Sequence, residues 1–308
     1  MIDKSDITQA YERIRSHIRL TPVIDIAAGI FDNESPWNFK LELMQHSGSF
    51  KARGAFNNLL SGNIPAAGIV AASGGNHGAA AAYAAKILGV PANIFVPEIS
   101  SAVKIAAIKS YGAETHIGGA TYAEALETSE EFIARTHALS VHAYNTDITL
   151  AGQGTVGLEW QQQAPDLDTI VVAVGGGGLV GGMACWYQND IKIIAVEPDT
   201  SCCLHTALDA GRPVDVPVSG IAADSLGARS VGALAFEIAE AFVDNSVVVS
   251  NQAIINAQKS LWKNMRIATE PGGAAAFAAL LGGAYKPAAN ERVGILVCGG
   301  NTTAVNFD

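Results

Sequence analysis

Short apolar runs alternate with longer segments of helical composition along most of the chain. The first unit is an apolar run over 68–73, which predicts a strand, followed by an alanine-rich segment over 76–89, which predicts a helix closed by Gly89. The same order then repeats. Strands are expected over 92–97 and 114–119, helices over 101–112 and from Tyr122 to about His137, and a further short run follows over 140–144.

A second block with the same alternation begins near residue 169. Its expected elements are strands over 169–174, 192–198, 243–250 and 292–300, a helix after the glycine-rich loop at 175–178, and a helix from Asn251 to about Ile267. The segment from Cys202 to Ser230 is irregular, and we expect it to be a surface-exposed connection.

The two blocks predict an α/β protein of two domains, because short apolar strands separated by helices form parallel sheets with right-handed crossovers. Each domain is expected to contain an open, twisted, mainly parallel sheet with flanking helices. The predicted large domain is discontinuous, over 1–56 and 145–308, and the predicted small domain covers 57–144. A cleft is expected between them.

Composition narrows the class of protein. The 308 residues are 49% hydrophobic and 16% charged, which fits a compact enzyme with a large core. The formal net charge is -10 and no basic block occurs, so we expect no nucleic-acid partner. The N-terminal segment lacks the pattern of a secretory signal, and the four cysteines are not needed as disulfides in a chain of this size. Both features indicate a cytoplasmic protein with reduced thiols.

The most apolar stretch, Thr169 to Tyr187, raises the question of a membrane span. Glycines interrupt it at 175–178 and at 181–182. A buried strand, a tight loop and a helix explain this stretch better than a span does, so we expect no membrane association.

Four consecutive glycines, Gly175 to Gly178, lie between an expected strand and an expected helix. Glycines allow backbone N–H groups to approach a ligand, and a helix N-terminus favours an anion, so a phosphate is the expected ligand. The run lacks the Gly-Lys-Ser/Thr ending of a Walker loop. Two alternatives stay open: a tight strand-to-helix turn, and a dinucleotide fold, whose fingerprint Gly175, Gly177 and Glu197 approximate.

The loop SGGNHG, Ser73 to Gly78, also lies between an expected strand and an expected helix. The side chains of Ser73, Asn76 and His77, together with backbone N–H groups, could form a cup for the carboxylate of an amino acid. The alternative is that Ser73 or Asn76 only caps the following helix.

Lys51 and Arg53 stand at the start of a further expected helix, where positive charge opposes the helix dipole. Proximity to a helix N-terminus and withdrawal from water both lower the pKa of a lysine, and a neutral lysine can act as nucleophile or base. Arg53 could add to this effect, or it could pair with an acid on the surface.

Five motifs fall in the order and spacing of a known family. They are SGSFKARGA (47–55), SGGNHG (73–78), GGGGL (175–179), EPGGA (270–274) and CGGN (298–301). With them the chain resembles the threonine/serine dehydratases and serine racemases, which are pyridoxal-phosphate enzymes of the tryptophan-synthase-like fold (fold type II). The resemblance begins at Arg19, extends to the CGGN motif, and implies a cofactor in the interdomain cleft.

The resemblance implies roles for single residues. Lys51 would bind the cofactor covalently and act as the catalytic base, with Phe50 against the cofactor ring. Asn76 would hydrogen-bond the phenolic oxygen, and Cys298 would face the pyridine nitrogen. The phosphate would be bound by Gly175, Gly176, Gly177, Gly178 and Leu179, and the substrate carboxylate by Ser73, Gly74, Gly75, Asn76 and His77.

Two positions depart from the family pattern. Racemases of this group carry a second serine where this chain has Gly74, so we expect little racemase activity. Related enzymes bind a divalent cation through a run that starts with Glu-Pro and ends in Asp, whereas the run from Glu197 ends in Cys203. A divalent cation is therefore doubtful, and no metal ligands are predicted. A soft-metal site at Cys202, Cys203 and His205 is not expected either, because no fourth ligand is evident.

The resemblance implies a pyridoxal-phosphate-dependent β-elimination from a β-hydroxy amino acid. The expected substrates are L-threonine, which would give 2-oxobutanoate and ammonia, and L-serine, which would give pyruvate and ammonia. Alternatives are 3-hydroxyaspartate, a phenylserine-like acid or a diamino acid and, in another class, a nucleotide-binding protein without catalysis. A homo-oligomer is expected, because family members are commonly dimers or tetramers.

Overall fold

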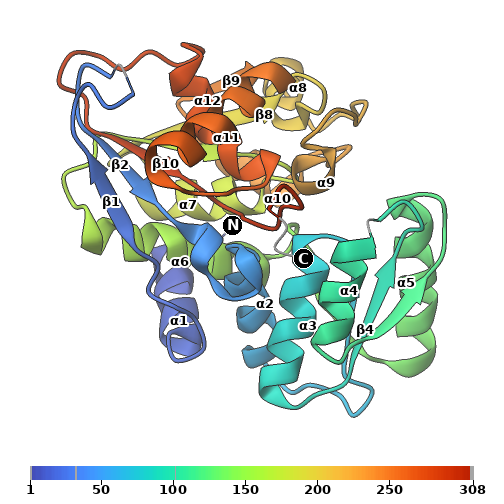
Figure 1. The fold of residues 1–308 in the computed structure, drawn as a ribbon. Helices are drawn as coiled ribbons and strands as arrows, with labels where there is room; N and C mark the ends of the chain where they lie inside the picture. The colour runs from blue at the N-terminus through green and yellow to red at the C-terminus, as the bar shows by residue number, and fades with distance from the viewer. Residues whose placement is uncertain (1, 32, 101, 306–308) are drawn as a thin grey trace.

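The computed structural model describes residues 2–31, 33–100 and 102–305, and its elements form two α/β units, each built on its own sheet (Figure 1). The larger sheet has the strand order β1-β2-β10-β7-β8-β9. β1 pairs antiparallel with β2, and all other neighbours pair parallel. The strands are β1 (Val23–Ile26), β2 (Trp37–Lys40), β7 (Thr169–Ala173), β8 (Lys192–Pro198), β9 (Asn245–Val249) and β10 (Val293–Leu296).

The smaller sheet has the order β5-β4-β3-β6, and all of its pairs are parallel. Residues along β3 alternate between its two faces: Ile69 and Ala71 pack with the core under α3, and Val70 and Ala72 pack with the core under α5. We call this sheet and its helices the small unit. Its elements are β3 (Ile69–Ala72), α3 (Asn76–Leu88), β4 (Ala92–Val96), α4 (Ala102–Ser110), β5 (Glu114–Ile117), α5 (Tyr122–Thr136) and β6 (Leu139–Ser140).

The remaining helices surround the larger sheet and form the large unit with it (Figure 1). Helices α7 and α12 pack directly on its strands, and α2 packs on both α6 and α3, so α2 lies where the two units meet. The helices are α1 (Lys4–Ile14), η1 (Glu42–Met44), η2 (His46–Gly48), α2 (Lys51–Leu60), α6 (Asp147–Gln163), α7 (Gly178–Tyr187), α8 (Cys203–Ala210), α9 (Ala223–Leu226), α10 (Ala233–Phe242), α11 (Asn251–Met265) and α12 (Pro271–Leu281).

The α/β class and the two mainly parallel sheets predicted from the sequence are confirmed. Helices α3, α5 and α11 begin at the residues predicted for them, and α4 lies inside 101–112, of which residue 101 is outside the described part of the chain. All strands of the smaller sheet fall within the small domain predicted over 57–144. The domain limits themselves stay a prediction.

Other expectations were incomplete or wrong. The segment from Cys202 to Ser230 is not only an irregular surface connection, because it contains α8 and α9, and α8 buries Cys203, Leu204 and Ala207. Strands β1 and β2 and helices α1 and α6 were not predicted. Helix α6 is buried continuously from Thr149 to Trp160, so its sequence carries no amphipathic pattern.

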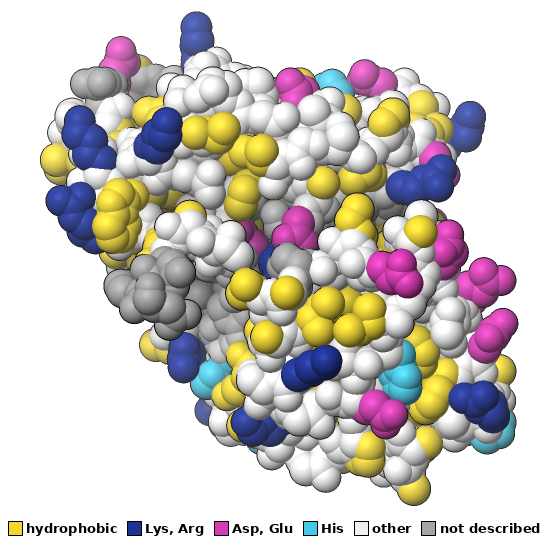
Figure 2. Space-filling view, turned by 45° about the vertical axis from the view of Figure 1, so that its right-hand side comes forward, with side chains coloured by type: hydrophobic (Ala, Val, Ile, Leu, Met, Phe, Trp, Pro, Cys, Tyr) yellow, Lys and Arg dark blue, Asp and Glu magenta, His cyan; other side chains and the backbone are white. Residues whose placement is uncertain are grey.

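The surface charge and the helix composition relate to two possible partners, nucleic acid and membrane. On the face in Figure 2, lysine and arginine side chains are scattered and do not gather into a basic patch. Across residues 2–31, 33–100 and 102–305, no helix combines the length and the apolar composition needed to cross a bilayer. The four cysteines are free thiols.

Candidate active site

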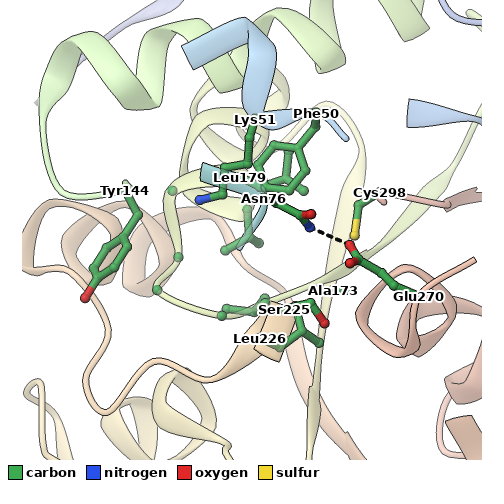
Figure 3. Close-up of a pocket in the computed structure, with 16 residues that line it drawn as sticks. Phe50, Lys51, Asn76, Tyr144, Ala173, Leu179, Ser225, Leu226, Glu270 and Cys298 are labelled. Carbon is green, nitrogen blue, oxygen red and sulfur yellow. Dashed lines mark hydrogen bonds between the residues drawn. The ribbon is translucent and has the colours of Figure 1, made fainter. Parts of the chain in front are cut away.

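One pocket, with a volume of about 480 Å³ including the space at its mouth, lies where the carboxyl ends of strands from both units meet. All nine residues predicted to bind the cofactor line it, and Figure 3 shows the side chains of several of them pointing into it. They are Phe50, Lys51, Asn76, Gly175, Gly176, Gly177, Gly178, Leu179 and Cys298. Of the residues predicted for the substrate carboxylate, only Asn76 lines this pocket.

The glycine loop connects β7 to α7 without room for side chains. A Cβ atom on Gly176 would lie 2.5 Å from ring carbons of Tyr144, and Gly177 has a φ of +90°, which favours glycine. Because α7 begins at Gly178, its first backbone N–H groups have no partner within the helix and face the end of the pocket near this loop. Phosphate is the ligand that this arrangement suits.

Lys51 is the first residue of α2, and its Nζ donates a hydrogen bond to the backbone oxygen of Ala143 at 2.7 Å. Burial lowers the pKa of Lys51 to about 8, while Cys298 acts weakly in the opposite direction. A substantial fraction of the amine is therefore neutral near physiological pH, as a nucleophile or base requires.

Arg53 does not pair with an acid on the surface, which corrects one of the two expectations for it. Its guanidinium is fully buried and binds Glu42 at 2.7 Å and Glu159 at 2.9 Å. Lys40, also buried, lies 2.5 Å from Glu159. This cluster of two cations and two carboxylates connects β2, η1, α2 and α6. The role of Arg53 is thus to fix the helix that carries Lys51, and the low pKa of Lys51 comes first from burial.

Asn76, Glu270 and Cys298 lie together on one wall of the pocket (Figure 3). Nδ2 of Asn76 donates to Oε1 of Glu270 at 2.5 Å, and Asn301 donates to Oδ1 of Asn76 at 2.7 Å. Burial raises the pKa of Glu270 to about 7 and also raises the pKa of the Cys298 thiol, so the thiol is neutral. Within the described part of the chain, Oε2 of Glu270 is buried without a hydrogen-bond partner.

These observations test whether the predicted cofactor fits the pocket. The pocket offers an amine for an aldehyde, a helix N-terminus for a phosphate, and an unpaired oxygen of Glu270 in its wall. A ring that bears an aldehyde and a phosphate matches this donor set.

The loop before α3 does not form the simple helix cap that was the alternative for it. Helix α3 begins at Asn76 with Gly75 as its N-cap, and no side chain caps it. Ser73 Oγ instead accepts the N–H of Gly75 at 3.1 Å. The N–H groups of the first turn of α3 are therefore left for an anion.

His77 and Gly74 in the same loop have defined surroundings. Nε2 of His77 lies 2.7 Å from the oxygen of Val141, to which it donates, and burial followed by the charge of Lys51 lowers the pKa of His77 to about 3. The ring is therefore neutral and held in place. At Gly74, a Cβ atom would lie 1.9 Å from Oγ of Ser100 and 2.9 Å from Cγ1 of Val96. A side chain at this position would therefore require Ser100 to move.

The segment that resembles a cation site is used within the fold. The buried carboxylate of Glu197 accepts the N–H groups of Leu204 and His205 at 2.9 and 2.7 Å, which satisfies the start of α8. Sγ of Cys203 donates to the oxygen of Gly175 at 3.2 Å and so contacts the glycine loop. Among the residues that the structure describes, no three or more His, Cys, Asp or Glu side chains are grouped to hold a metal ion. Because the carboxylate of Glu197, on β8, is buried against the start of α8, it is also not placed to bind a ribose.

Sequence reasoning gave no role to several residues that line the pocket. Glu270 belongs to the EPGGA motif, so its motif pointed to the site although no role was assigned to it. Tyr144, Ser225 and Leu226 lie in or next to irregular segments, and only contacts across the fold bring them to the glycine loop and to Gly272. Asp224, which had no assigned role, forms an ion pair with Lys104 of α4.

Comparisons with known proteins agree with this geometry. The chain matches the family model described as pyridoxal-phosphate dependent enzyme over residues 14–299. It is 37% identical over 312 residues to a phenylserine dehydratase of Ralstonia pickettii, covering 99% of this chain and 95% of the relative. It is 34% identical to an L-threonine ammonia-lyase of Geobacter sulfurreducens, covering 98% and 76%. The structure of maize serine racemase matches with a TM-score of 0.92 at 33% identity, covering 98% and 94%.

Proposed function

The chain belongs to the family of pyridoxal-phosphate dependent enzymes, and on that premise we propose that it removes the β-hydroxyl group of a β-hydroxy amino acid and releases ammonia and a 2-oxo acid. Its cofactor is pyridoxal 5'-phosphate. Relatives named as a dehydratase and an ammonia-lyase support a carbon–nitrogen lyase. The observation that carries the proposal is the pocket in which Lys51 lies with Asn76, Cys298 and the glycine loop.

The residues that line the pocket indicate how the cofactor would be bound. The amine of Lys51 would hold the cofactor through its aldehyde carbon, and Gly175 to Leu179 would bind the phosphate with backbone N–H groups. Asn76 would donate to the phenolic oxygen and Phe50 would pack on the ring. When bound, the cofactor supplies an electron sink for the electron pair left at the substrate Cα.

Lys51 would also move the proton. Nζ of Lys51, when not bonded to the cofactor, would accept the proton from the substrate Cα. Two features of the chain support this role. The burial of Lys51 favours the neutral amine, and its hydrogen bond to the backbone oxygen of Ala143 fixes the direction of Nζ. The substrate then loses its β-hydroxyl as water, and hydrolysis of the remaining imine returns the water and releases ammonia.

The start of α3 would orient the substrate. A carboxylate held by the N–H groups of the Ser73–His77 loop gains from the positive end of the helix dipole. The neutral, buried ring of His77 keeps the loop in place through the oxygen of Val141.

The thiol of Cys298 affects whether elimination or a longer-lived carbanion is favoured. A neutral thiol that faces the pyridine nitrogen of the cofactor cannot keep that nitrogen protonated as a carboxylate would. The cofactor is then a weaker electron sink, which favours prompt elimination over a long-lived carbanion. We also propose little racemase activity, although serine racemases are among the relatives, because Gly74 has no side chain that can transfer a proton and Ser100 occupies the adjacent space.

L-Threonine and L-serine are the substrates we propose first, since they are the smallest acids that carry the required hydroxyl group. A second candidate is an acid with an aryl group on Cβ. It is favoured by the phenylserine dehydratase relative, which covers 99% of this chain.

The test is the release of 2-oxo acids by the purified holoenzyme from a panel of β-hydroxy amino acids. We expect release from at least one of them, and a loss of about 10²–10⁴-fold in the Lys51→Ala variant. The matched control is Lys86→Ala, which removes a lysine from the outer part of α3 and leaves the pocket intact. A holoenzyme that carries the cofactor but releases no 2-oxo acid from any member of the panel would contradict the proposed function.

A further inference from the structure

Asn301 is the last residue of the CGGN motif, and it is not one of the described residues that line the pocket. Its amide nitrogen Nδ2 donates to the backbone oxygen of Ser47 at 2.8 Å and to Oδ1 of Asn76 at 2.7 Å. Asn301 is therefore one residue removed from the space that would hold the cofactor, and it can affect that space through Asn76.

The carbonyl of Ser47 determines which way the amide of Asn301 points. A backbone oxygen only accepts hydrogen bonds, so the group that Asn301 turns toward Ser47 must be its NH2 group. This NH2 group carries two hydrogens, and the second is directed at Asn76. The atom of Asn76 that faces Asn301 is therefore its oxygen, and the NH2 group of Asn76 faces the other way.

The NH2 group of Asn76 is thereby turned toward Glu270 and the pocket. One of its hydrogens is donated to Oε1 of Glu270 at 2.5 Å (Figure 3). Asn76 lines the pocket, and among the residues that the structure describes Nδ2 has no second acceptor. The other hydrogen is thus available to an oxygen of a ligand, as the proposed contact with the phenolic oxygen of the cofactor requires.

Glu270 does not determine this orientation by itself. Burial raises the pKa of Glu270 to about 7, so its carboxyl group is protonated in part of the molecules near neutral pH. A protonated carboxyl group can donate to the oxygen of an amide as well as accept from its NH2 group. Asn301 has no such choice, because a reversed amide of Asn76 would place the NH2 groups of the two asparagines against each other.

Backbone hydrogen bonds hold the CGGN motif against the turn that precedes α2. The N–H of Gly300 donates to the oxygen of Gly48 at 2.9 Å, and the N–H of Phe50 donates to the oxygen of Cys298 at 3.2 Å. Gly48 has a φ of +78°, and a Cβ atom on it would lie 2.3 Å from Oδ1 of Asn301. The fold thus fixes Asn301 between the turn before α2 and the start of α3.

We propose that Asn301 is a positioning residue, which makes Asn76 a hydrogen-bond donor toward the phenolic oxygen of the cofactor. This inference rests on the proposed function, because it takes the contact of Asn76 with that oxygen from it. A donor next to the phenolic oxygen stabilises the phenolate relative to the neutral phenol. Asn301 therefore supports the phenolate form of the bound cofactor without touching it. Without Asn301, the amide of Asn76 can present either of its two polar atoms.

The test is a double-mutant cycle with two measurements, the absorption spectrum of the holoenzyme and the dissociation constant of pyridoxal phosphate from titration of the apoprotein. Asn301→Ala should shift absorption from the yellow phenolate band toward the band of the neutral phenol and should weaken binding about threefold or more. In an Asn76→Ala background, Asn301→Ala should change the dissociation constant by less than about twofold and should leave the spectrum unchanged. The matched control is Asn264→Ala, which removes an exposed asparagine from α11 and should change neither measurement.

Equal effects of Asn301→Ala in the two backgrounds would overturn the inference, because Asn301 would then act without Asn76. An Asn76→Ala variant with the spectrum and affinity of the wild-type chain would overturn it as well. If Asn301→Ala does not fold, the same cycle with Asn301→Asp decides by the same criterion. An ionised aspartate keeps the size of the side chain but cannot donate, and its charge is present in both backgrounds. None of these measurements depends on turnover, so the release of 2-oxo acids by the wild-type holoenzyme tests the proposed function separately.

Discussion

Lys51 and Arg53 are separated by one residue on α2, yet the protein gives the two cations opposite environments. Lys51 lines the pocket and donates to the neutral oxygen of Ala143, and burial lowers its pKa to about 8. Arg53 is buried against the carboxylates of Glu42 and Glu159, which hold it charged. Lys51 is thus placed to act in catalysis, and Arg53 is placed to stabilise the fold.

Removing Arg53 should lower the stability of the fold more than it affects catalysis directly. Arg53→Met leaves Glu42 and Glu159 buried with Lys40 as the nearest cation, so we expect the free energy of unfolding to fall by about 3–5 kcal/mol. The measurement is urea denaturation of the variant and of the wild-type chain. Arg15→Met is the control, because the exposed pair of Arg15 with Glu12 should contribute less than about 1 kcal/mol. Equal effects of the two substitutions would show that the buried cluster does not hold α2.

Glu270 should give the apoprotein a measurable dependence of stability on pH. Its pKa of about 7 in the folded chain lies above the usual value of 4.5 because of burial, so between these pH values the folded state keeps a proton that the unfolded state has lost. Its contribution to stability is therefore complete below about pH 4.5 and is lost as the pH rises to about 7.

The comparison with Glu270→Gln isolates this effect, because glutamine does not titrate. Between pH 4.5 and 7.5, the unfolding free energy of the wild-type apoprotein should fall relative to that of the variant by up to about 3 kcal/mol. The measurement is denaturant unfolding of both chains at several pH values. A difference between them that stays constant over this range would contradict the assigned environment of Glu270.

At the scale of elements, the turn from β7 into α7 should be the part most sensitive to added atoms. Gly176→Ala places a Cβ atom against the ring of Tyr144, so the loop or the ring must move. We expect the affinity for pyridoxal phosphate to fall tenfold or more, about 1.4 kcal/mol. Titration of the apoprotein with the cofactor measures it. Gly118→Ala is the control, because no atom lies within 4 Å of the added carbon. Unchanged affinity in Gly176→Ala would mean that this loop does not bind the phosphate.

The elements also show which features the sequence reveals. Strands β3, β4, β7 and β8 are apolar runs next to helices with clear starts, so local patterns were enough to predict them. Helix α6 was missed because it is buried on every side from Thr149 to Trp160, and a helix whose buried stretch mixes apolar and polar residues has no amphipathic period to detect. Helices α8 and α9 are short and were hidden in an irregular segment.

The site was predictable where motifs lie at the ends of such strands. The glycine loop and Asn76 were found in this way, Lys51 was found from its charge at a helix start, Cys298 came from the family resemblance, and all of them line one pocket. The environment of Arg53 could not be found, because its partner Glu159 comes from a distant helix that was itself not predicted. Tyr144 was missed for a similar reason: it has no motif, and only the folded chain places its ring on Gly176.

At the scale of the whole molecule, the site needs both units. Asn76 of the small unit bonds to Glu270 of the large unit (Figure 3). Lys51 of α2 bonds to Ala143, which follows β6. The ion pair of Lys104 on α4 with Asp224 on α9 is a further link between the units. Figure 1 shows the small unit next to α9 and α2 at this junction. The amine, the phosphate loop and the proposed carboxylate cup therefore come together only in the assembled chain.

Borohydride trapping would show whether Lys51 holds the cofactor. The holoenzyme is reduced with sodium borohydride, digested, and its peptides are analysed by mass spectrometry. We expect a yellow protein and a stable pyridoxyl group on Lys51, with Lys40, buried against Glu159, unmodified as an internal control. A pyridoxyl group on another lysine, or a loaded enzyme in which no lysine is modified, would contradict it.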